Sequence, residues 1–172
     1  MAKTVELRRH TDNDGDILTP EGVEAALEIG RGLSGDYQVA VSTGAQRATQ
    51  AIACMLAGLG QAVPGGVTVE AGLRSEAEDR WRAIAGEASG GDLASFRDVD
   101  AGFVDDEARS LGAALERVFA SLGDGGRALV VGHSPTNEAA VLGLAGELIE
   151  PMGKGEGVLI VDDGGYSVEP IT

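Results

Sequence analysis

The chain has 172 residues, 43% apolar and 24% charged, a composition that favours a folded globular protein over a disordered one. Its formal net charge of −15 argues against nucleic acid or an anionic membrane as a partner, because both would repel it. The single cysteine, Cys54, excludes an internal disulfide and fits a reducing compartment. Because no apolar leader or long apolar run is present, we expect a cytoplasmic protein without a membrane span.

The pattern along the chain predicts strands that alternate with helices. Val5-Glu6-Leu7-Arg8 alternates apolar and charged residues, as a β-strand does, and Thr19-Pro20 then begins a helix that ends at Gly35. The other predicted elements are a strand over 37–41, helix 45–59, strand 67–69, helix 78–85, helix 105–122, strand 128–131, helix 134–148 and a hairpin over 157–169. This order predicts one domain over residues 1–172, a three-layer α/β/α fold with a mainly parallel sheet and a C-terminal hairpin.

Three predicted strands end in residues that suit the chemistry of phosphate. His10 follows the first strand and Arg9, and His133, the only other histidine, follows the strand over 128–131. Arg47 falls in the first turn of the helix after the second strand, beside N–H groups that favour anions. Because parallel strands place their carboxyl ends at one edge of the sheet, we expect these side chains to converge into a pocket for a phosphoryl group.

Such a pocket has a mechanism available to it. A neutral imidazole can attack phosphorus and hold a covalent phosphoryl group, and arginines stabilise the charge on the transferring oxygens. Their positive field also keeps the imidazole unprotonated at neutral pH. This chemistry requires neither a metal nor a cofactor.

Three blocks of the sequence resemble, in order, those of the histidine phosphatase superfamily, which includes cofactor-dependent phosphoglycerate mutases. The blocks are Leu7-Arg8-Arg9-His10, the run from Val41 to Gln50, and Val130-Val131-Gly132-His133-Ser134. The segment Leu18-Thr19-Pro20-Glu21-Gly22 is also similar to that family. The small size of the chain most resembles the short branch that contains phosphohistidine phosphatases.

The resemblance implies a phosphoglycerate mutase-like fold and a role for each matched residue. It makes His10 the phosphorylated nucleophile, Arg9 and Arg47 phosphate ligands, and His133 the second catalytic histidine. Many members carry a glutamate proton donor at the place of Ser75, so the neighbouring Glu76 becomes the candidate acid here. Glu78 and Asp79 follow closely, and a good leaving group such as imidazole would not need a strong acid.

The family also usually has glycine or alanine after the arginine-histidine pair, where this chain has Thr11. We therefore expect a metal-independent phosphatase that acts on a phosphorylated small molecule or phosphoprotein through a phosphohistidine. The alternatives are a mutase-like phosphotransferase and a weakly catalytic phosphate-binding module, which Ser75 favours. Substrate identity and oligomeric state stay open.

Three other functional interpretations fail on particular residues. Gly132-His133-Ser134-Pro135-Thr136 lacks the second glycine of a hydrolase nucleophile elbow, and no histidine follows Ser134, which we interpret as a helix N-cap. The acidic run over 12–16 lacks the glycine and the closing glutamate of a calcium loop, so we expect a solvated turn. Cys54 lies at core spacing in its helix and is not followed by an arginine at the distance that a cysteine phosphatase loop requires, so we expect it to pack in the core.

Overall fold

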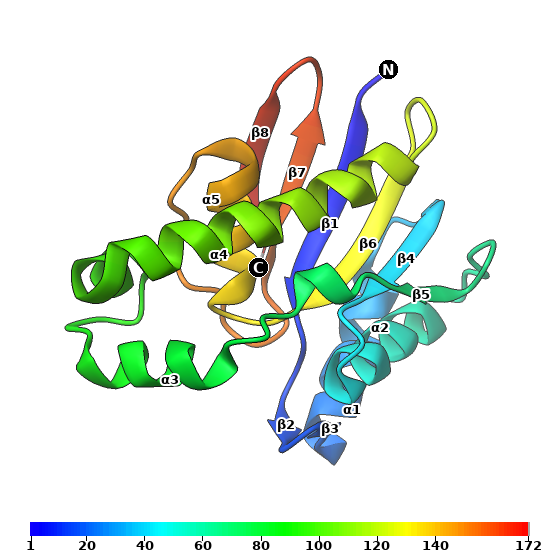
Figure 1. Ribbon diagram of the computed structural model, residues 1–172. Helices are drawn as coiled ribbons and strands as arrows, with labels where there is room; N and C mark the ends of the chain where they lie inside the picture. Colours follow the sequence, from blue (N-terminus) through cyan, green and yellow to red (C-terminus); the bar gives the residue numbers. More distant parts are fainter. Residues whose placement is uncertain (172) are drawn as a thin grey trace.

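A six-stranded sheet organises residues 1–171, the part of the chain that the computed structural model describes (Figure 1). The strand order is β5-β4-β6-β1-β7-β8. The strands are β1 Lys3–Arg9, β4 Val39–Ser42, β5 Val67–Val69, β6 Arg127–Gly132, β7 Gly157–Asp162 and β8 Tyr166–Ile171. The first four in this order are parallel, and β7 and β8 form an antiparallel hairpin against β1. The predicted mainly parallel sheet with a closing hairpin is confirmed.

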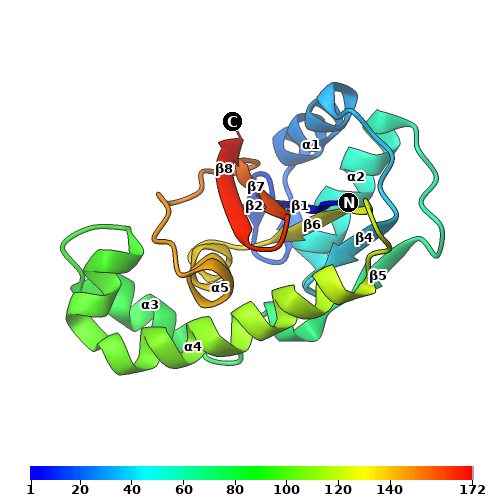
Figure 2. The same cartoon turned by 90° about the horizontal axis from the view of Figure 1, so that it is seen from above.

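Helices cover both faces of this sheet, as Figure 2 shows. Those of one face are α1 Pro20–Gly32 and α2 Gln46–Leu59, and those of the other are α4 Leu93–Ser121 and α5 Thr136–Ala145. The remaining elements are α3 Glu78–Glu87, the short helix η1 Ala71–Leu73, and a small separate hairpin of β2 Asn13–Asp14 and β3 Ile17–Leu18. Over residues 1–171, no helix is both long and apolar enough to cross a membrane.

The period-two pattern of the strands distributes the core between the two faces of the sheet. In β6, Ala128 and Val130 pack under α4 and α5, whereas Leu129 and Val131 pack against α1 and α2. The charged residues Glu6 and Arg8 of β1 are buried as well, because each has a polar partner beside it. The Glu6 carboxylate accepts hydrogen bonds from Tyr37 Oη at 2.9 Å and from Arg8 Nε at 2.7 Å.

The sequence pattern missed the first part of α4. It predicts a helix from residue 105, but α4 begins at Leu93 and is interrupted at Asp100, whose φ of −153° and ψ of 83° are not helical. Phe96 anchors this first part against Trp81 of α3, with ring centroids 6.2 Å apart. A tertiary contact between aromatic rings therefore stabilises a segment that lacks helical periodicity.

The start of α5 also differs from the prediction. The helix begins at Thr136 with Pro135 at its N-cap, so Ser134 does not cap it, and the Ser134 hydroxyl donates to the Glu138 carboxylate at 2.5 Å. Ser134 and Pro135 instead form a loop that leads from β6 over the sheet edge, with a cis peptide bond between them.

Candidate active site

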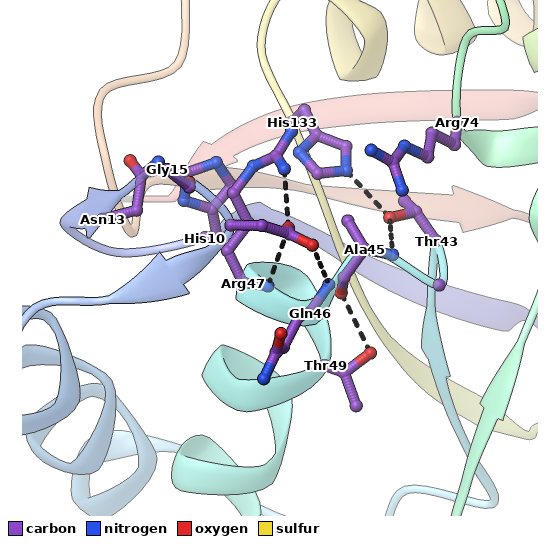
Figure 3. Close-up of polar contacts among 12 residues, drawn as sticks. His10, Asn13, Gly15, Thr43, Ala45, Gln46, Arg47, Thr49, Arg74 and His133 are labelled. Carbon is purple, nitrogen blue, oxygen red and sulfur yellow. Dashed lines mark hydrogen bonds and ion pairs between the residues drawn. The ribbon is translucent and has the colours of Figure 1, made fainter.

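Register between β1 and β6 places the two histidines side by side. Arg9 pairs with Gly132, so His10 and His133 leave adjacent strands at the same edge of the sheet. The His10 amide donates to the Gly132 carbonyl at 3.0 Å, and the imidazole rings lie edge to face with centroids 5.3 Å apart. Figure 3 shows both rings with Arg47 of α2, so the structure brings together three strand ends that are distant in sequence.

His10 is held in the protonation state that a nucleophile needs. Its Nδ1 lies 2.8 Å from the Thr11 carbonyl oxygen, which can only accept, so Nδ1 bears the hydrogen and Nε2 keeps its lone pair. The side chain is buried, and this burial together with the Arg47 and Arg9 guanidinium groups lowers the pKa of His10 to about 4. At neutral pH the imidazole is uncharged.

His133 presents the opposite ring nitrogen to the site. Its Nε2 lies 2.8 Å from Thr43 Oγ1, which accepts from the Ala45 amide and is free to donate to the ring. When Thr43 donates, the ring hydrogen resides on Nδ1, which is buried and has no hydrogen-bond partner within residues 1–171. Burial, Arg47 and His10 lower the pKa of His133 to about 3.

Arg47 lies in the first turn of α2 and is positioned by a carboxylate from another segment. Asp16 Oδ1 accepts from Arg47 Nη1 at 2.8 Å, and the same carboxylate accepts from the amides of Gln46 and Arg47 at 3.3 Å. The helix has no side-chain cap of its own, since its N-cap is Ala45. Burial would raise the pKa of Asp16, but these hydrogen bonds and the Arg47 charge lower it overall. The sequence predicts a solvated turn here, and Asp16 is indeed exposed in a turn, from which its carboxylate also reaches Arg47.

Two further arginines contribute positive charge. Arg9 donates from Nη1 to the Met152 carbonyl at 2.9 Å, while its Nε is buried without a hydrogen-bond partner within the described chain. Arg74 follows η1 and is among the cations that lower the pKa of His133 (Figure 3). Sequence reasoning gave no role to Arg74, which no local pattern marks, or to Thr43, although Thr43 lies in the matched run from Val41 to Gln50.

The segment after His10 packs on the start of α1, the part of the chain from Leu18 to Gly22 whose sequence resembles the family. Thr11 Oγ1 donates to the Gly22 carbonyl at 2.7 Å, and the Thr19 amide donates to the Asp12 carbonyl at 3.0 Å. A Cβ at Gly22 would overlap the Asp12 carbonyl, so glycine lets α1 approach this loop closely. The Thr19-Pro20-Glu21-Gly22 helix start therefore supports the backbone that orients His10.

A cleft of about 290 Å³ extends from His133 and Arg47 between α3 and the start of α5. Its other lining residues are Ser75, Glu78, Trp81, Arg82, Ala85, Ser134, Pro135 and Thr136. Glu76, the acid expected from the sequence, is exposed and lines a separate groove with Glu107. The carboxylate that the structure places in the cleft is that of Glu78. Within residues 1–171 no three His, Cys, Asp or Glu side chains are grouped as metal ligands.

Comparison with solved structures identifies the fold. No protein-family model and no curated protein matches the sequence. A phosphoserine phosphatase from Entamoeba histolytica has a TM-score of 0.71 at 14% identity, over 98% of this chain and 94% of that one. A phosphoglycerate mutase from Bacillus anthracis has a TM-score of 0.68 at 19% identity, over 99% and 92%.

A third solved structure, described as a phosphohistidine phosphatase, is similar as well. A phosphohistidine phosphatase SixA candidate from Agrobacterium tumefaciens has a TM-score of 0.57 at 14% identity, over 98% of this chain and 97% of that one. At these identities the likeness concerns the fold, and it spans nearly the whole of every chain compared. The chain therefore has a phosphoglycerate mutase-like fold, the fold that its sequence blocks imply.

Proposed function

We propose that the protein is a metal-independent phosphatase that works through a phosphohistidine on His10. The observation that supports this most strongly is the tautomer of His10, because the bond from Nδ1 to the Thr11 carbonyl leaves Nε2 unprotonated. The buried, unpartnered His133 Nδ1 and the cations Arg9 and Arg47 supply donors for phosphoryl oxygens.

The reaction has two steps. In the first, His10 Nε2 forms a bond to phosphorus while the bond from phosphorus to the leaving-group oxygen breaks. Arg47, Arg9 and His133 Nδ1–H stabilise the oxygens of the transferring group. In the second step a water oxygen attacks phosphorus, the N–P bond breaks, and the proton of that water passes to a base. Phosphate leaves and His10 is again neutral.

Glu78 is the base in this proposal, because its carboxylate lines the same cleft as His133 and Arg47. It replaces Glu76, which lies in the other groove. A carboxylate in the cleft also favours an enzyme over a phosphate-binding module. A module that only binds phosphate has no hydrolysis step and needs no base. A mutase would share the first step and return the phosphoryl group to a second acceptor, so product analysis distinguishes it from a phosphatase.

The proposal is tested by hydrolysis of p-nitrophenyl phosphate in excess chelator. We expect turnover by the wild type and a loss of at least about a thousandfold in His10→Gln, which keeps a polar side chain but removes the nucleophile. Glu76→Gln is the matched control and should retain wild-type activity, whereas Glu78→Gln should slow turnover. Ordinary turnover by His10→Gln, or none by folded wild type, would overturn the proposal.

A further inference from the structure

Ser75 stands where the family resemblance places the proton donor, and its hydroxyl is already engaged elsewhere. Ser75 Oγ donates to Glu107 Oε1 and accepts from the Ala77 amide at 3.0 Å. Trp81 Nε1 donates to the same Glu107 oxygen at 2.9 Å. The Ser75 hydroxyl hydrogen therefore points to α4, and it is not available to a leaving group in the cleft.

Glu78 enters the cleft as an acceptor. Its carboxylate accepts from Arg74 Nε at 2.9 Å and lies 3.8 Å from Arg82 Nη2. A carboxylate between two guanidinium groups can take a proton from water in the second step. It is poorly placed to give one in the first, because both of its oxygens face guanidinium N–H groups and not the histidine pair.

The histidines offer no acidic proton either. Burial and the neighbouring arginines hold the pKa of His10 at about 4 and that of His133 at about 3, so both rings are neutral at pH 7. The other cleft cations are arginines, which do not deprotonate in proteins. Among the residues that line the cleft, no group is thus suited to protonate the leaving group.

We infer that the site selects phosphoryl compounds whose leaving group departs as an anion, namely aryl and acyl phosphates, and discriminates against alkyl phosphates. This inference rests on the proposed function and specifies its substrate class. In the first step the N–P bond to His10 forms as the P–O bond breaks, and the leaving-group oxygen keeps the bonding electron pair without receiving a proton. The second step proceeds with water as described above.

The test is a series of aryl phosphates that differ in the pKa of the phenol, together with acetyl phosphate and an alkyl phosphate. We expect kcat/KM of the wild type to fall about threefold or more for each unit of leaving-group pKa, and alkyl phosphate to be at least about a hundredfold slower than p-nitrophenyl phosphate. Equal rates across the series would overturn the inference and leave the phosphatase intact. No turnover of even the best leaving group by folded protein would overturn the proposed function, and the inference with it.

Replacement of Ser75 gives a second readout. Ser75→Glu puts a carboxyl group beside the cleft, whereas Ser75→Gln has the same size but no acidic proton. We expect Ser75→Glu alone to flatten the dependence on leaving-group pKa and to raise alkyl phosphate hydrolysis by about a hundredfold. If both variants fail to fold, the wild-type series still decides. An identical dependence in the wild type and in folded Ser75→Glu would contradict the inference.

Discussion

His10 and His133 differ from ordinary surface histidines because the fold buries them next to each other and beside Arg47. Each ring must lose its proton to enter this environment, since an imidazolium there would be desolvated and repelled. The same arrangement that prepares a nucleophile therefore makes folding depend on pH.

We predict that stability falls as pH is lowered below 6.5. The pKa of His10 is lowered from 6.5 to about 4 and that of His133 to about 3, so the unfolded chain binds more protons between these values. Stability is fully present above pH 6.5 and decreases by about 1.4 kcal/mol per pH unit for each histidine as pH falls toward the folded-state values. Urea unfolding at pH 7.5, 6.5, 5.5 and 5 measures this. A His10→Gln/His133→Gln variant with an unchanged pH dependence would contradict it.

Gly132 ends β6 immediately before His133 and has no room for a side chain. A Cβ there would overlap Asn137 Oδ1, and Asn137 cannot move freely because its Nδ2 donates to the Arg8 carbonyl at 3.1 Å. We predict that Gly132→Ala lowers the free energy of unfolding by about 1–3 kcal/mol and lowers turnover, because His133 is displaced. Gly86→Ala is the matched control: Gly86 is exposed in α3 with open space around it, and alanine there should stabilise by about 0.5–1 kcal/mol. Equal effects of the two substitutions on stability would refute the steric explanation.

Among the elements, α2 depends most clearly on a contact from outside itself. Its N-terminus carries the phosphate-ligand candidate Arg47, yet Ala45 at the N-cap provides no side-chain acceptor. The β2–β3 hairpin supplies the missing acceptor through Asp16. The hairpin is itself tied to α2 by the Leu18 amide, which donates to Gln50 Oε1 at 2.8 Å.

We predict that Asp16→Ala lowers stability by about 1 kcal/mol, the usual cost of losing a helix N-cap. Asp14→Ala is the control in the same hairpin, since Asp14 is exposed, and it should change stability by less than about 0.5 kcal/mol. Thermal unfolding of the two variants at pH 7 compares them. Equal stability of both would show that Asp16 does not cap α2.

The elements also show where sequence reasoning succeeds. Thr19 caps α1 as predicted, with its hydroxyl accepting from the Gly22 amide at 3.0 Å, because this bond depends only on neighbours in the chain. Ser134, which also precedes a proline, is not a cap, since α5 begins at Thr136 with Pro135 at its N-cap, and the Ser134 hydroxyl donates to the Glu138 carboxylate. A serine or threonine before a proline therefore predicts a cap only where that proline begins the helix, as Pro20 does and Pro135 does not.

At the scale of the whole molecule, the predictable part of the site is the part that sheet topology determines. Parallel strands must end at one edge, so the amino-acid sequence alone suffices to place His10, His133 and Arg47 together. It does not place Asp16, Thr43 and Glu78, because their positions depend on how the hairpin, a loop and α3 pack over that edge. The first part of α4 escapes prediction for the same reason.

Trapping the covalent intermediate tests the phosphohistidine mechanism most directly. Wild-type protein is mixed with p-nitrophenyl phosphate in excess chelator, quenched in base and digested, and the phosphorylated peptide is mapped by mass spectrometry. We predict base-stable, acid-labile phosphate on His10 in the wild type and none in His10→Gln. Turnover without any phosphoryl group on His10, or phosphate on another residue, would contradict this mechanism.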